Sequence, residues 1–98
     1  MAFIIQLTLR ARSEYALLET NPALIKRLKA VSKAIAMLES NPRHPGLRTH
    51  KFNDRTGPQG QDVFEAYAEN NTPGAYRIFW HYGPDKDVIT ILAITQHP

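Results

Sequence analysis

The stretch AYRIFWHYGPDKDVITILAIT, residues 75–95, decides how this chain is expected to fold. It holds two runs of β-branched and aromatic residues, AYRIFWHY and DVITILAIT, and such runs favour β-strands. Between the two runs, GPDKD at residues 83–87 is typical of a tight turn. The stretch therefore predicts two antiparallel strands joined as a hairpin.

Side chains alternate between the two sides of a strand, so the residue parity predicts which of them share a face. In the first run, Arg77, Phe79 and His81 point one way, and the other way point Tyr76, Ile78, Trp80 and Tyr82. In the second run, Ile89, Ile91, Ala93 and Thr95 oppose Val88, Thr90, Leu92 and Ile94. One face is then mostly apolar and suits a core, while the other carries Arg77, His81 and, from the run VFEAYA, Glu65. An antiparallel sheet covered on one side only permits this division.

The N-terminal part of the chain predicts one strand followed by two helices. In AFIIQLTL, residues 2–9, Phe3, Ile5, Leu7 and Leu9 fall on one face of a strand. Ser13 is expected to cap a short helix that passes Leu18. Asn21 is expected to cap a second helix, with Pro22 at its first position and its end near Ser40, before Pro42. Its apolar stripe is formed by Leu24, Leu28, Val31, Ile35 and Leu38.

The middle of the chain adds further strands. LRTHKF, residues 47–52, is a possible short strand, DRTGPQGQ, residues 54–61, has the composition of a loop, and VFEAYAEN, residues 63–70, reads as a strand. The order is strand, two helices, then three or four strands. We therefore expect a single α+β domain over residues 1–98, with two N-terminal helices packed on a mostly antiparallel sheet of four to five strands.

Composition narrows the classes of function. The chain has no cysteine, which excludes disulfides, thiol catalysis and cysteine-rich zinc sites. No apolar run reaches the length of about 18 residues that a transmembrane helix needs, and the N-terminus has no secretion signal, so a cytoplasmic location is expected. The net charge of +3 suits an anionic partner.

Several side chains could carry chemistry, and each also has an ordinary structural interpretation. Arg77 is either paired with Glu65 on the sheet or a phosphate clamp, because a guanidinium binds two phosphate oxygens at once. His81 is either a plain hydrogen-bonded histidine or a contact to RNA. The basic residues of the middle segment are either solvated or follow a nucleic-acid backbone; they are Arg43, Arg48, Lys51 and Arg55.

The last candidates are histidines. His97 is either part of an unordered tail or, if the sheet holds it, a general acid or base. His44, His50, His81 and His97 have none of the spacings of a known zinc motif, so we expect neither a metal nor a cofactor.

Taken together, FIIQLTL, the paired helices, LRTHKF, VFEAYAENNTPGAYRIFWHYG and ITILAITQHP resemble the RelE/ParE superfamily of toxins from type II toxin–antitoxin systems, with the RelE-like branch favoured. The resemblance covers essentially the whole chain, and its best motif is the YRI core of the arginine-bearing strand. It implies a small, metal-independent endoribonuclease that cuts messenger RNA on the ribosome. In that reaction the 2′-hydroxyl next to the scissile phosphate attacks it.

The resemblance also assigns residues. Arg77 matches the arginine that binds the phosphate in the transition state, and His97 matches a C-terminal proton-transfer residue. Lys51, with His50 or Arg48, falls in the strand that often supplies a basic catalytic group. Glu65 lies where some members place a carboxylate base.

Two alternatives remain open within this resemblance and one outside it. ParE-like relatives share the fold but inhibit DNA gyrase without a ribonuclease site, and an inactive relative could serve as an interaction module. A basic domain that binds RNA without toxicity is the third. Under the toxin interpretations, we expect a cognate antitoxin as partner, besides mRNA and the ribosome, and either a homodimer or a hetero-oligomer with the antitoxin.

Overall fold

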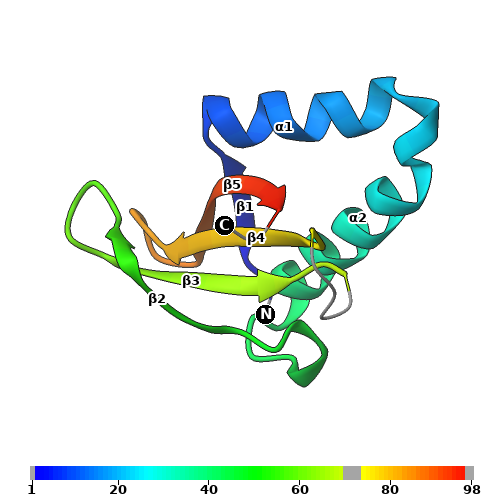
Figure 1. Cartoon of the computed structure of the whole chain (residues 1–98). Coiled ribbons are helices and arrows are strands. Elements are labelled where there is room, and N and C mark those ends of the chain that lie inside the picture. Colours follow the sequence, from blue (N-terminus) through cyan, green and yellow to red (C-terminus); the bar gives the residue numbers. More distant parts are fainter. Residues whose placement is uncertain (1, 70–73, 97–98) are drawn as a thin grey trace.

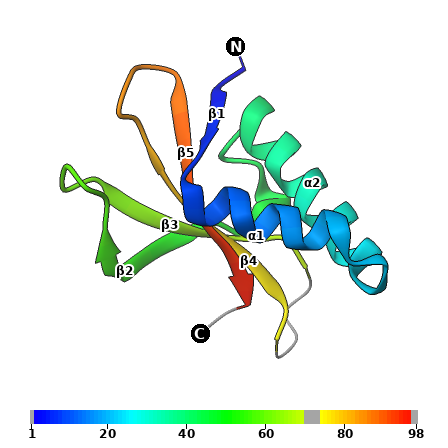
Figure 2. The ribbon, with the colours of Figure 1, turned by 90° about the horizontal axis from the view of Figure 1, so that it is seen from above.

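The computed structural model describes residues 2–69 and 74–96. The strands are β1 (Ile4–Leu7), β2 (His50–Thr56), β3 (Asp62–Tyr67), β4 (Tyr76–Tyr82) and β5 (Val88–Gln96), and the helices are α1 (Leu9–Thr20) and α2 (Ile25–Ser40). Short 3₁₀ turns at Pro22–Leu24 and Pro45–Leu47 precede α2 and β2. Figures 1 and 2 show the β2–β3 hairpin extending away from the helices.

The strands form one sheet of five strands in the order β1-β5-β4-β3-β2. β1 runs parallel to β5, and the other three pairs are antiparallel. This confirms the predicted α+β class, with two helices on a mostly antiparallel sheet. Neither helix in the described part of the chain is long and apolar enough to cross a membrane.

The helices pack on one side of the sheet, which we call the helix face. The predicted stripe of α2 lies in this core: Val31 and Leu38 are fully buried, and the rest of the stripe packs against them. From the sheet, the helix face contributes Ala66, Ile78, Trp80, Ile91 and Ile94. The other side of the sheet, the open face, carries a smaller apolar cluster formed by Phe52, Val63, Phe79, Leu92 and Ala93.

The predicted alternation is correct on β4 but changes partway along β5. Ile78 pairs with Ile94 and Phe79 with Ala93, whereas Trp80 pairs with Ile91. β5 therefore has one extra residue at this point, a β-bulge, which shifts the parity of the strand. As a result, Ile91 and Ile94 both belong to the core under the helices, while Ala93 belongs to the open face.

The first helix begins earlier than predicted. Thr8, not Ser13, is its N-cap: its hydroxyl accepts from the Ala11 N–H at 3.1 Å and donates to the Leu92 carbonyl at 3.0 Å. Leu9, expected on the buried face of the first strand, is instead the first residue of α1 and is exposed. Asn21 is a cap as predicted, through the Ala23 N–H, but of the 3₁₀ turn Pro22–Leu24 and not of α2, which begins at Ile25.

α1 covers the edge of β5 that β1 leaves open. β1 ends at Leu7, which pairs with Ile91, so beyond that point this edge of β5 has no neighbouring strand among the described residues, while its other edge pairs with β4. The Glu14 carboxylate fills this gap, because its Oε1 accepts from the Ile94 N–H at 2.8 Å. Such pairing matters because an unsatisfied buried N–H is costly. This contact holds the C-terminal half of β5 against α1.

Candidate functional site

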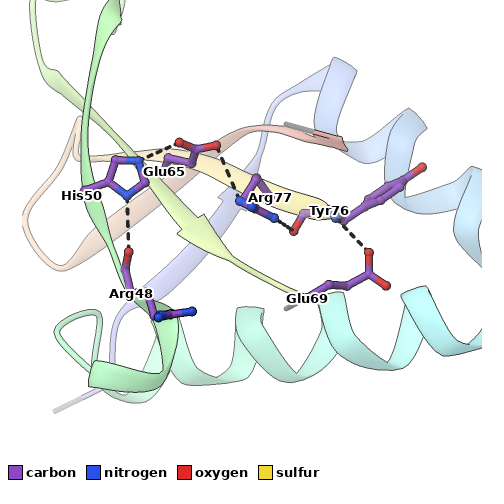
Figure 3. A network of polar contacts seen from close by, with 6 residues as sticks. All are labelled: Arg48, His50, Glu65, Glu69, Tyr76 and Arg77. Atoms are coloured by element: carbon purple, nitrogen blue, oxygen red, sulfur yellow. Dashed lines mark hydrogen bonds and ion pairs between the residues drawn. The ribbon is translucent and has the colours of Figure 1, made fainter. Parts of the chain in front are cut away.

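A chain of polar contacts crosses the open face from β2 to β4, as Figure 3 shows. His50 pairs with Glu65 in the β2–β3 register, and Glu65 pairs with Phe79 in the β3–β4 register. The His50 Nε2 lies 2.8 Å from the Glu65 Oε1, and the Arg77 Nε lies 3.8 Å from the Glu65 Oε2. One carboxylate thus holds an imidazole on one side and a guanidinium on the other.

Arg77 and Glu65 are both removed from water. Their side chains are 3% and 0% exposed, so each charge requires the other as a partner. The Arg77 guanidinium also lies over the Tyr67 ring, 3.9 Å from its centroid, and its Nη1 donates to the Tyr76 carbonyl at 3.3 Å. In this arrangement the guanidinium pairs with Glu65 and is covered by the Tyr67 ring. An incoming phosphate reaches the guanidinium only if that ring moves away.

His50 is the accessible member of the network. Its side chain is 49% exposed, and its ring stands edge-on to Tyr67, with the centroids 6.0 Å apart. Its Nδ1 lies 3.4 Å from the Arg48 carbonyl, which is long for a hydrogen bond. The buried Glu65 carboxylate fixes the Nε2 of the ring, whereas the Nδ1 has only the long contact to a carbonyl, which a substrate could replace. This is the arrangement of an oriented proton-transfer histidine.

Arg48 adopts an unusual backbone conformation beside this histidine. Its φ of 49° and ψ of 39° are left-handed, at the end of the Pro45–Leu47 turn. Such a conformation costs a non-glycine residue about 1–3 kcal/mol and is frequent at functional sites. It directs the Arg48 carbonyl toward His50, and the Arg48 guanidinium lies over Tyr67, 5.5 Å from the ring centroid.

A hollow of about 460 Å³ borders the network on the open face. Its lining includes Arg10, Arg55, Phe52, Phe79, Thr95 and Gln96. Phe79 and Thr95 are the register partners of Glu65 and Arg77, so the hollow and the network are contiguous. Cationic side chains next to aromatic rings form a surface that suits single-stranded nucleic acid, through phosphate attraction and base stacking.

The structure therefore brings together three of the predicted catalytic residues: His50, Glu65 and Arg77. Lys51 does not join them. It pairs with Phe64 in register, and alternation places its side chain on the opposite side of β2 from His50, where its Nζ lies 3.3 Å from the Asp62 Oδ1. The structure therefore does not place the Lys51 side chain with Arg77, although the resemblance assigns Lys51 to the catalytic strand. His97 lies outside the described residues.

The residues predicted to contact RNA also lie in different places in the structure. Arg55 lines the hollow, but as part of β2 rather than of a loop, because the strand continues to Thr56 and the turn is confined to residues 57–61. Arg48 lies beside His50, and Arg43 is exposed in the connection between α2 and β2. His81 is buried, and its Nδ1 contacts the Tyr82 carbonyl at 2.8 Å, so it is not a surface contact for RNA.

Arg10 is the residue of the hollow that the sequence did not indicate. It follows β1 in the chain and is positioned by Glu14, whose Oε2 accepts from the Arg10 Nε at 3.3 Å. Only the parallel pairing of β1 with β5 brings the start of α1 next to the end of β5. The sequence could have identified Arg10 as a residue of the hollow only if that pairing had been known.

No set of metal ligands is found among the described residues of this site. Within residues 2–69 and 74–96, no group of three or more histidine, aspartate or glutamate side chains is placed to hold a metal ion.

Solved structures share this fold over nearly the full length of the chain. The YoeB/ParE toxin from Agrobacterium tumefaciens superimposes with a TM-score of 0.72 at 10% identity, over 97% of this chain and 99% of that chain. The YoeB dimer from Staphylococcus aureus gives 0.66 at 14% identity, over 100% of both chains. The RelE–RelB complex from Pyrococcus horikoshii OT3 gives 0.65 at 18% identity, over 98% of this chain and 96% of that chain.

The similarity to known proteins is found in the structure of the chain and not in its sequence. No protein-family model matches the chain, and no curated protein matches it in sequence. The identities to the solved structures lie between 10% and 18%, so the similarity concerns the fold. The chain has the fold of the RelE/ParE superfamily toxins, which confirms at that level the resemblance noted in its sequence.

Proposed function

We propose that this protein is the toxin of a toxin–antitoxin pair and acts as a metal-independent endoribonuclease that cleaves mRNA on the ribosome. The observation that carries the proposal is the pairing of the exposed His50 with the buried Glu65 beside a cationic and aromatic hollow. A histidine–carboxylate pair supplies proton transfer, and the hollow supplies affinity for a single RNA strand.

His50 acts as the general base in this scheme. When its Nε2–H donates to Glu65, its Nδ1 carries a lone pair that can take the proton of an RNA 2′-hydroxyl. The 2′-oxygen then attacks the neighbouring phosphorus, and the bond to the 5′-oxygen breaks. Glu65 stabilises the imidazolium that forms. The products are a 2′,3′-cyclic phosphate and an RNA fragment with a free 5′-hydroxyl.

The other residues at the site have supporting roles. Arg10 and Arg55 line the hollow and bind the backbone phosphates. His97 directly follows Gln96, which lines the hollow, and we propose that it protonates the leaving 5′-oxygen. Arg77 pairs with Glu65 and holds it in place, and contacts the phosphate only if Tyr67 moves away from its guanidinium.

An antitoxin is the proposed protein partner. Two of the structures with this fold are complexes of that kind: RelE–RelB from Pyrococcus horikoshii OT3, and the toxin–antitoxin complex RelBE2 from Mycobacterium tuberculosis, with a TM-score of 0.52. The exposed cations of the open face would attract an acidic segment of such a partner.

Mapping of RNA ends in cells tests the proposal. The protein is induced in a bacterial host that carries two reporter transcripts, identical except that one has no ribosome-binding site. We expect growth arrest and new 5′-hydroxyl ends on the translated reporter only. Ends on both reporters would remove the ribosome from the proposal. Intact transcripts together with DNA damage would replace it with gyrase inhibition.

A further inference from the structure

A second pocket, of about 430 Å³, lies between the α2–β2 connection and the aromatic end of β4. Its walls include Arg43, His44 and Arg48 from the connection, and Phe64, Trp80 and Tyr82 from the sheet. The even-numbered residues of β3 and β4 belong to the helix face, so this pocket is distinct from the hollow on the open face.

The sheet side of the pocket is a cluster of three aromatic rings. The Trp80 centroid lies 5.0 Å from that of Phe64 and 4.9 Å from that of Tyr82. Trp80 is buried beneath the other two, whereas Tyr82 is 40% exposed. A partly exposed ring backed by other rings is a rigid platform on which a planar group can stack.

The connection side of the pocket is cationic. Arg43 and Arg48 are exposed, and in the described part of the chain no aspartate or glutamate lines the pocket. His44 has a defined tautomer, since its Nδ1 accepts from the Gly46 N–H at 2.9 Å. Its Nε2 therefore carries a proton, and all three side chains are hydrogen-bond donors.

Two polar atoms of wall residues have no hydrogen-bond partner in the described part of the chain. The indole Nε1 of Trp80 and the hydroxyl of Thr49 are shielded from solvent and form no hydrogen bond within residues 2–69 and 74–96. Both residues line this pocket. Unpaired buried polar atoms are rare and require an explanation. A ligand with acceptor oxygens would satisfy them once a wall side chain has moved.

From these observations we infer that this pocket binds one unpaired nucleotide of an RNA strand, with the base on Tyr82 and the phosphate on Arg43 and Arg48. Stacking on an exposed ring combined with guanidinium contacts is how proteins hold single-stranded RNA. Arg48 connects the pocket to the proposed cleavage site, because its carbonyl oxygen lies 3.4 Å from the His50 Nδ1. The inference depends on the proposed function for the identity of the nucleic acid.

The chain provides its own reporter for this pocket. Trp80 is the only tryptophan in the sequence, so its fluorescence reports on the pocket alone. The probe is a single-stranded RNA octamer with 2′-O-methyl groups, which binds but cannot be cleaved because the attacking hydroxyl is blocked. We expect saturable quenching of Trp80 by this probe.

Substitutions identify the contacts. Tyr82→Leu should weaken binding at least tenfold, and Tyr82→Phe should remain within threefold of the original protein because the ring is kept. Arg43→Gln should weaken binding. It should also make the decrease of log K with log salt concentration less steep by about 0.7, the value of one phosphate contact to a single strand. Lys29→Gln removes an equal charge from the exposed surface of α2 and should leave both quantities unchanged.

The outcomes separate the inference from the function on which it depends. RNA that binds without quenching Trp80, and equally well to Tyr82→Leu and Arg43→Gln, overturns the pocket. Quenching by a peptide of alternating glutamate and phenylalanine, without quenching by RNA, overturns it in favour of a protein ligand. Quenching by RNA together with no cleavage of the translated reporter keeps the pocket and rejects the ribonuclease. Because Arg43 is exposed, its variant remains informative even if changes at Tyr82 prevent folding.

Discussion

Removing Glu65 alone should destabilise the protein far more than removing Glu65 and Arg77 together. In Glu65→Leu, the Arg77 guanidinium stays buried without a counter-charge. At the observed 3.8 Å and an effective dielectric constant of about 20, the lost attraction is roughly 4 kcal/mol. Breaking one side of a buried ion pair typically costs about 3–5 kcal/mol. A cost of this size is a large part of the stability of a small protein, about 5–15 kcal/mol.

The double variant Glu65→Leu/Arg77→Met removes both charges and replaces them with apolar groups. Such replacements are often nearly neutral. Urea unfolding of the original protein, the two single variants and the double variant gives the coupling energy directly. We expect the double variant to be more stable than the sum of the single effects by at least about 2 kcal/mol. Additive effects, within about 0.5 kcal/mol, would show that the two charges do not depend on each other.

Three further predictions concern the elements that support the open face. Thr8→Ala removes the cap of α1 and a bond to β5, and should lower the free energy of unfolding by about 1–2 kcal/mol in urea titrations. Glu14→Ala leaves the buried Ile94 N–H unpaired and should cost about 1–3 kcal/mol, whereas Glu14→Gln keeps an acceptor there and should cost less. Leu38→Ala, in the core, should cost about 2–5 kcal/mol, while Leu17→Ala, on the exposed side of α1, should stay within about 0.5 kcal/mol by the same measurement.

Local sequence patterns were sufficient to predict which residues of an element are buried where a single periodicity runs along that element. The spacing of four and three along α2 identified the residues that pack in the core, and strict alternation on β4 placed Arg77 and Phe79 on the open face. In both cases the pattern reflects one regular geometry with one buried side. Asn21 was identified as a cap because its side chain acts on a neighbour two residues away.

Features that depend on contacts distant in sequence could not be predicted in this way. The bulge that shifts the parity of β5 arises from its pairing with β4, and the cap at Thr8 is reinforced by the carbonyl of Leu92. Arg10 reaches the hollow only because α1 starts next to β5.

The assignment of Lys51 to the site came from the resemblance alone. Alternation places its side chain on the opposite side of β2 from that of His50. His50 and Lys51 test the whole account, because they are adjacent along β2 but their side chains lie on opposite faces.

The most direct test is therefore to compare His50→Ala with Lys51→Ala in cleavage of translated mRNA, by counting 5′-hydroxyl ends per transcript after induction. Proton-transfer groups typically contribute about 10²–10⁴-fold, so the account predicts that His50→Ala lowers the frequency of these ends at least 100-fold. Lys51→Ala should leave it within about threefold, because the Lys51 side chain lies away from the network. If a folded His50→Ala protein cuts as well as the original, or if Lys51→Ala abolishes cutting, the open face is not where the RNA is cleaved.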